Sequence, residues 1–105
     1  MIDNNIQEQI KIIIKEKNIV LFMKGNKQTP QCGFSSLVVK ILCLQNVDFY
    51  AVDVLMNEEL RQGIKYFSDW PTIPQLYVKG EFIGGCDIVK ELHNNGTLAE
   101  ILRAD

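Results

Sequence analysis

One cysteine in this sequence stands where a thiol becomes reactive. Cys32 follows the polar stretch 24–31 and precedes an apolar helical pattern, so it lies at the start of a predicted helix. The partial positive charge and free N–H groups of a helix N-terminus favour a thiolate over a thiol. Lys24 and Lys27 can add positive charge nearby. We therefore predict an exposed, functional thiol at Cys32, against the alternative of an inert core cysteine.

The position three residues after Cys32 is Ser35. A dithiol oxidoreductase carries a second cysteine there, which resolves the mixed disulfide formed by the first. The chain has three cysteines at wide spacings, and this odd number favours neither paired zinc ligands nor a disulfide framework. We predict reduced thiols, with Cys43 in the protein core and with a resolving role for Cys86 left open.

The composition is that of a soluble globular protein. The 105 residues are 47% hydrophobic and 23% charged, and they fit a single domain that spans residues 1–105. No apolar run approaches the ~18 residues that would predict a membrane span, so no membrane partner is expected. A net charge of −2 argues against nucleic-acid binding, while the basic residues near Cys32 suggest an anionic small molecule. The segment 1–5 resembles neither a signal peptide nor a transit peptide, and we expect a cytoplasmic protein.

Hydrophobic periodicity places Cys32 between a buried strand and a helix. We expect helices at 5–17, 34–45, 57–68 and 86–95, a last helix that begins with a capping box at Thr97 and Glu100, and strands at 19–23, 48–53, 75–78 and 81–84. The first two strands flank a helix, which implies a parallel crossover, and the last two form a hairpin at Lys79 and Gly80. The pattern predicts an α/β protein with a four-stranded mixed sheet and helices on both faces.

Three spaced motifs resemble those of the monothiol glutaredoxins. Cys32-Gly33-Phe34-Ser35 is similar to their CGFS signature, and Lys24 lies eight residues upstream, as in that family. The segments 70–74 and 84–87 also match in order and spacing. The resemblance implies a thioredoxin-like fold and a glutathione site.

The same resemblance assigns roles to residues far apart in the sequence. Lys24 and Arg61 would hold the glycyl carboxylate of glutathione, with Lys65 as a weaker candidate. The backbone near a cis-proline at Pro74 would pair with the cysteinyl part, and the first turn of a helix would bind the γ-glutamyl end. The implied binding residues are Lys24, Arg61, Thr72, Ile73, Pro74, Gly85, Cys86 and Asp87. The alternative for Asp87 is a structural N-cap, and His93 is expected at the surface.

Two functions follow from one reactive thiol beside a glutathione site. A 2Fe-2S cluster commonly needs four thiolates, which Cys32 from each of two protomers and one glutathione sulfur from each could supply. The resemblance favours this iron-sulfur carrier, a homodimer when cluster-bound, which receives clusters from a scaffold, delivers them to apo-proteins and partners a BolA-like protein. The alternative is a glutathione-dependent thiol-disulfide oxidoreductase that uses Cys32. A third hypothesis, a thioredoxin-like adaptor, predicts no glutathione affinity.

Overall fold

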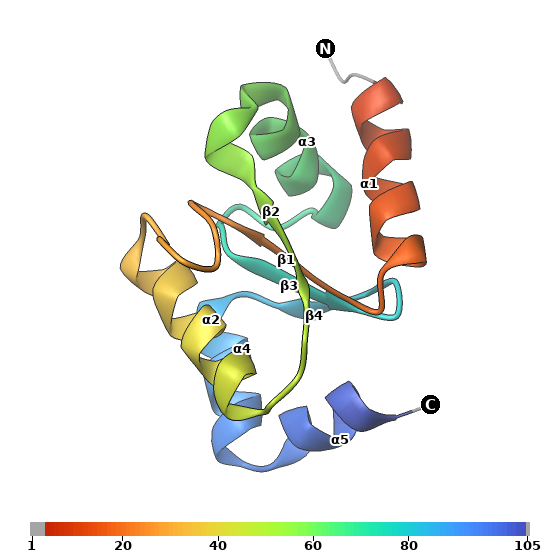
Figure 1. Ribbon diagram of the computed structural model, residues 1–105. Coiled ribbons are helices and arrows are strands. Elements are labelled where there is room, and N and C mark those ends of the chain that lie inside the picture. Colours follow the sequence, from red (N-terminus) through yellow and green to blue (C-terminus); the bar gives the residue numbers. More distant parts are fainter. Residues whose placement is uncertain (1–3, 105) are drawn as a thin grey trace.

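The computed structural model describes residues 4–104. Residue 105 and residues 1–3, on which part of the targeting prediction rests, lie outside the described residues. Figure 1 shows a central sheet with helices packed around it. The helices are α1 (Asn4–Glu16), α2 (Gly33–Leu44), the 3-10 helix η1 (Val54–Met56), α3 (Glu58–Ser68), α4 (Cys86–Asn94) and α5 (Thr97–Arg103), and the strands are β1 (Ile19–Met23), β2 (Tyr50–Asp53), β3 (Gln75–Val78) and β4 (Glu81–Gly84).

The sheet has the strand order β2-β1-β3-β4. Strand β1 runs parallel to β2 and antiparallel to β3, and β3 and β4 form the antiparallel hairpin. Helices α1 and α3 lie on one face, while α2 and α4 cover the other (Figure 1). The prediction of a thioredoxin-like α/β fold with a four-stranded mixed sheet is therefore confirmed.

Strand β1 separates two hydrophobic cores. Its side chains alternate between the faces of the sheet, as a period of two requires. Leu21 belongs to the cluster under α2, α4 and α5, and Phe22 belongs to the cluster under α1 and α3. All five residues of β1 are buried, which confirms the prediction of a strand covered on both faces. This buried strand leads directly into the loop that precedes Cys32.

Several local predictions are confirmed and others are wrong. Asn57 caps α3 as expected, because its Oδ1 accepts the backbone N–H of Leu60 at 3.1 Å. The predicted capping box at Thr97 is wrong, since Thr97 is the first residue of α5 and its N–H donates to Asn95 Oδ1 at 2.9 Å. Gly96 allows this start because it adopts a left-handed conformation with φ 86°. Strand β2 begins at Tyr50, the first of its residues that pairs with β1.

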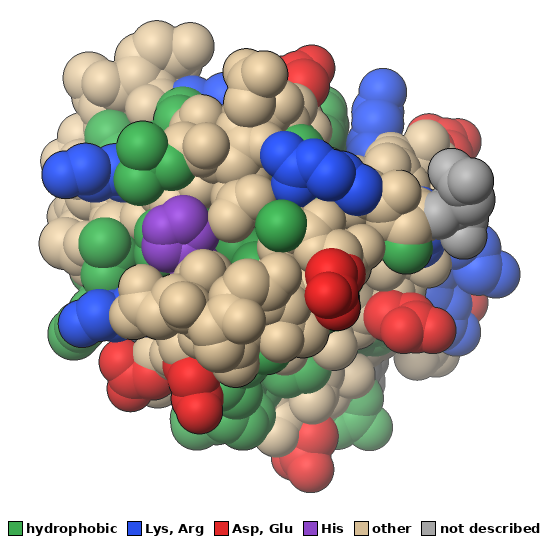
Figure 2. Space-filling view, turned by 90° about the horizontal axis from the view of Figure 1, so that it is seen from below, with side chains coloured by type: hydrophobic (Ala, Val, Ile, Leu, Met, Phe, Trp, Pro, Cys, Tyr) green, Lys and Arg blue, Asp and Glu red, His purple; other side chains and the backbone are tan. Residues whose placement is uncertain are grey.

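One side chain lies in an environment other than the one predicted, and a second is at the surface as expected but is only partly exposed. Cys43 is exposed and not in the core, because α2 buries only the side that faces the sheet and α4. His93 is half-buried, and its Nδ1 lies 2.9 Å from Gln45 Nε2. Figure 2 shows the molecule from below, and the histidine side chain, in purple, is visible there among mainly uncharged atoms. Among the described residues, no helix is long and apolar enough to cross a membrane.

Candidate functional site

Cys32 is the N-cap residue of α2. Its backbone is extended, with φ −149° and ψ 138°, and its carbonyl oxygen accepts the N–H of Ser36 at 2.9 Å. The thiol makes no capping hydrogen bond, and the residue is half-exposed. The side chain is thus free to react next to the first-turn N–H groups of α2, as the sequence predicts.

The loop before Cys32 is held at both ends. The N–H of Gly25 donates to Asp53 Oδ1 at 3.0 Å, and the N–H of Gln31 donates to the carbonyl oxygen of Lys24 at 2.9 Å. Gly25 has φ 88°, and a Cβ there would lie 2.6 Å from the backbone nitrogen of Gln31. Only glycine permits this close crossing of the two ends of the loop. These hydrogen bonds fix both ends of the loop that leads to Cys32.

Ser35 and Lys27 have structural contacts that the sequence did not indicate. The Ser35 side chain is fully buried, and its Oγ accepts the backbone N–H of Lys24 at 3.1 Å. Lys27 lies with its Nζ 3.2 Å from an Asp48 carboxylate oxygen and 4.3 Å from the centre of the Phe49 ring. This ion pair lowers the pKa of Asp48, chiefly through the hydrogen bond from Lys27. Lys27 therefore engages the chain near β2, while Lys24 faces the cavity described next.

A cavity of about 540 Å³ lies beside Cys32. It brings together residues from the end of β1, from α2, from α3, from the segment before β3 and from the start of α4. The lining residues are Lys24, Phe34, Lys65, Trp70, Pro71, Thr72, Ile73, Pro74, Gly85, Cys86, Asp87 and Ile88. Cys32 lies two residues before the lining residue Phe34, and its charge makes a small contribution to the raised pKa of Cys86. Seven of the eight predicted binding residues therefore surround one cavity.

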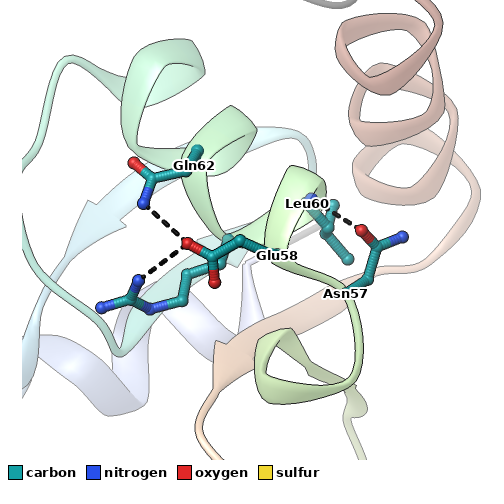
Figure 3. A network of polar contacts seen from close by, with 5 residues as sticks. Asn57, Glu58, Leu60 and Gln62 are labelled. Atoms are coloured by element: carbon teal, nitrogen blue, oxygen red, sulfur yellow. Dashed lines mark hydrogen bonds and ion pairs between the residues drawn. The ribbon is translucent and has the colours of Figure 1, made fainter.

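The remaining predicted binding residue, Arg61, lies outside this lining. Its Nη1 is 3.2 Å from Glu58 Oε1, which also accepts a hydrogen bond from Gln62 at 2.9 Å (Figure 3). These contacts lower the pKa of Glu58, with the Gln62 hydrogen bond as the largest cause. Lys65, one turn later on α3, lines the cavity. The structure thus places Lys65, the weaker candidate by resemblance, in the lining of the cavity and leaves Arg61 outside it.

Two walls of the cavity touch each other. The Ile73–Pro74 peptide bond is cis, as the resemblance implies. Where the two walls meet, a Cβ on Gly85 would lie 3.2 Å from Trp70 Nε1 and 3.3 Å from the Pro74 carbonyl oxygen. A larger residue at position 85 would therefore push the walls apart. The indole nitrogen of Trp70, which the sequence showed only as part of a motif, is the nearest of these atoms.

The first turn of α4 forms the polar end of the cavity. Gly85 is the N-cap residue, so the alternative interpretation of Asp87 as a structural N-cap is wrong. Asp87 is exposed in the first turn, and no residue among 4–104 forms a hydrogen bond or ion pair with its carboxylate. Burial raises the pKa of the Cys86 thiol, the charge of Asp87 raises it further, and Lys90 opposes the shift. Cys86 is thus held in its protonated form more firmly than a free thiol.

Comparisons with known proteins agree with this geometry. The sequence model of the Glutaredoxin family matches residues 19–83. "Probable monothiol glutaredoxin 2" of Rickettsia typhi is 52% identical over 103 residues, which cover 98% of this chain and 93% of that protein. Human glutaredoxin-3 is 51% identical over 100 residues, so the chain matches 95% of its own length but only 30% of that relative.

Solved structures show the same fold. The solution structure of reduced poplar apo GrxS14 has a TM-score of 0.79 and 51% identity, and the match covers 90% of this chain and 86% of that chain. A buckwheat glutaredoxin-glutathione complex has a TM-score of 0.84 at 22% identity, with 94% and 88% of the two chains covered. The first match agrees in sequence and in fold, and the second agrees in fold alone.

Proposed function

Since the chain belongs to the glutaredoxin family, and within it to the monothiol glutaredoxins, we propose that it binds glutathione beside Cys32 and carries a 2Fe-2S cluster to apo-proteins. One observation carries the proposal. A half-exposed thiol at a helix N-terminus borders a cavity with cationic groups at one part of its lining and a free carboxylate at another.

The charges of the cavity match those of glutathione. This tripeptide has a carboxylate at its glycyl end, and both a carboxylate and an ammonium group at its γ-glutamyl end. Lys24 and Lys65 are half-buried cations suited to the first carboxylate. The first-turn N–H groups of α4 suit the second, and the Asp87 carboxylate faces the same region for the ammonium group. The sulfur of glutathione would then lie toward Cys32.

The thiols of one chain are too few to hold a cluster alone. Among residues 4–104, no group of three or more Cys, His, Asp or Glu side chains is close enough to hold a metal. Four thiolates are commonly required for a 2Fe-2S cluster. Two chains that each supply Cys32 and one bound glutathione would complete the set. Because half of these ligands are held non-covalently, the cluster is suited to be cargo that is passed on.

The partners are predictions from the resemblance. They comprise a cluster scaffold, apo-protein recipients, a BolA-like protein and a homodimer in the cluster-bound state. A cytoplasmic location is likewise a prediction from the sequence.

A second function rests on the free side chain of Cys32. Its thiolate would attack a protein-glutathione disulfide and release the protein thiol, leaving glutathione bonded to Cys32. A second glutathione thiolate would then attack that mixed disulfide, releasing Cys32 and oxidised glutathione. Ser35 provides no thiol for an internal route.

Anaerobic reconstitution with iron, sulfide and glutathione distinguishes the two functions. We expect visible cluster absorption and a dimeric mass by gel filtration in the wild type, and the loss of both in Cys32→Ser. Cys43→Ser is the matched control, because it removes an exposed thiol that does not line the cavity. A colourless monomer that reduces glutathione mixed disulfides through Cys32 would instead establish the oxidoreductase. Absence of both activities and of glutathione affinity would favour the adaptor.

A further inference from the structure

A buried amide lies directly behind one wall of the cavity. Gln75 is fully buried, and its Nε2 donates to the carbonyl oxygens of Trp70 at 3.3 Å and Thr72 at 3.2 Å. Its Oε1 accepts the hydroxyl of Tyr77 at 3.2 Å. The orientation of the amide follows from these partners, because an exchange of oxygen and nitrogen would set an acceptor against two carbonyls. Both N–H groups of the amide thus hold the backbone of the wall.

The wall that Gln75 holds has no helix or strand of its own. Residues 70–74 connect α3 to β3, and all five line the cavity. The start of the segment is tied to α3, because the N–H of Trp70 donates to the Lys65 carbonyl at 3.2 Å and to Ser68 Oγ at 3.1 Å. From Trp70 to Thr72, the hydrogen bonds from Gln75 set the path of the backbone.

The hydroxyl of Tyr77 contacts the Gln75 amide on the side away from the wall. Tyr77 is 2% exposed, and burial raises the pKa of its hydroxyl to about 12, although Ser68 partly opposes this. The hydroxyl therefore stays protonated and can donate to Gln75 at any physiological pH. Its ring packs edge-on against Phe22, with the ring centroids 5.5 Å apart, and in a tilted arrangement against Phe82, with the centroids 5.4 Å apart. The support behind the wall is thus anchored in the aromatic part of the core.

A shift of residues 70–74 would also shift the opposite wall of the cavity, which begins at Gly85. Gly85 approaches Trp70 and Pro74 so closely that a Cβ at this position would require these neighbours to move by a few tenths of an ångström. Gly85 caps α4, whose first turn carries Cys86 and Asp87. The spacing between the two walls therefore depends on the path of residues 70–74.

We propose that Gln75 is a positioning residue: by holding the carbonyls of Trp70 and Thr72, it sets the spacing of the cavity walls and the affinity for glutathione. The identity of the ligand rests on the proposed function. The positioning itself rests on the hydrogen bonds of Gln75 and on the close approach of Gly85 to Trp70 and Pro74.

The test compares two variants that both weaken the same buried network. Gln75→Met keeps a similar volume but removes both donors to the wall. Tyr77→Phe keeps those donors and removes only the hydroxyl behind the amide. Trp70, the single tryptophan of the chain, reports glutathione binding by its fluorescence. Chemical shifts of the Gly85 and Cys86 amides report the wall spacing in the absence of any ligand.

We expect Gln75→Met to raise the Kd for glutathione about tenfold, which corresponds to about 1.4 kcal/mol. It should also shift the Gly85 and Cys86 amide resonances. Tyr77→Phe should change the Kd by no more than about twofold, because the donors to the wall remain. Circular dichroism verifies that each variant is folded. Gln75→Leu, which also removes both donors and adds no charge, is a second variant whose Kd should rise to a similar extent as that of Gln75→Met.

Three results have distinct meanings. Equal glutathione affinity in the wild type and Gln75→Met would overturn the positioning role. Equal effects of Gln75→Met and Tyr77→Phe on affinity and on the Gly85 resonance would also overturn it, because a purely structural contribution predicts that outcome. If the wild type binds no glutathione, the proposed function fails, and the ligand-free shifts alone decide whether Gln75 positions the wall.

Discussion

The buried hydroxyl of Ser35 accepts a hydrogen bond from the backbone N–H of Lys24 at 3.1 Å. This contact joins the first turn of α2 to the residue that follows β1, and the loop that leads to Cys32 runs between these two points. Ser35 occupies the position at which a dithiol enzyme has its second cysteine. A thiol is a weaker acceptor than a hydroxyl, so serine contributes to the fold as well as removing a resolving group.

Ser35→Ala should destabilise the protein by about 1–3 kcal/mol, because it leaves the part-buried N–H of Lys24 without an acceptor. Ser36→Ala is the matched control, since Ser36 is exposed and should change the free energy of unfolding by less than about 0.5 kcal/mol. Urea denaturation measures both. Equal stabilities of the two variants would show that the Ser35 contact contributes nothing.

Gly84→Ala should cost about 2 kcal/mol of stability through strain and overpacking. Gly84 has φ 154°, and a Cβ there would lie 2.7 Å from Ile88 Cβ, at the junction of β4 and α4. Gly33→Ala is the control, because a Cβ at the start of α2 meets no atom within 4 Å. Thermal unfolding should show a lower Tm for Gly84→Ala alone. Full stability of this variant would contradict the predicted clash.

Alkylation of Cys86 should depend on two neighbouring charges. Burial makes the largest contribution to the raised pKa of the Cys86 thiol, and the charge of Asp87 raises this pKa further. Lys90 lowers it. Asp87→Asn should therefore increase the thiolate fraction at pH 8, and Lys90→Gln should decrease it. We expect rate changes of about two- to threefold in opposite directions, and both should shrink in high salt.

Mass spectrometry in a Cys32→Ser background isolates the reaction of Cys86. The exposed Cys43 serves as an internal reference in each sample. The same direction of change in both variants would rule out the electrostatic explanation.

Lys65 should contribute more to glutathione binding than Arg61. Lys65→Gln removes a cation that lines the cavity and should raise the Kd about fivefold. Arg61→Gln makes the same change of charge on the same helix, but Arg61 is paired with Glu58 outside the lining. Its Kd should stay within about twofold of the wild type. Calorimetric titration at low and physiological salt measures both, and a larger effect of Arg61→Gln would restore the order that the resemblance implies.

Local patterns in the sequence were sufficient to predict much of the fold. The buried strand β1, the hairpin at Lys79 and Gly80, and the N-cap at Asn57 each depend on a few adjacent residues. The position of Cys32 at a helix start is of the same kind, because it follows from a change of periodicity at one point of the chain.

The predictions failed where the environment of a residue depends on contacts between segments that are distant in the sequence. Nothing near Cys43 distinguishes the exposed side of α2 from the buried one, and nothing near His93 indicates its contact with Gln45. The roles of Asp53 as an acceptor for Gly25 and of Gln75 behind the cavity wall were likewise not visible.

The sequence by itself determined the local position of the reactive groups of this protein: Cys32 at a helix N-terminus, a serine in place of a second thiol three residues later, and the motifs of a monothiol glutaredoxin. Only the tertiary structure decided that Lys65 and not Arg61 lines the cavity, and that Gln75 supports its wall. The physical reason is that helix and strand periodicity are encoded over a few residues, whereas a cavity is formed by side chains from several elements. Their distances exist only once those elements have packed together.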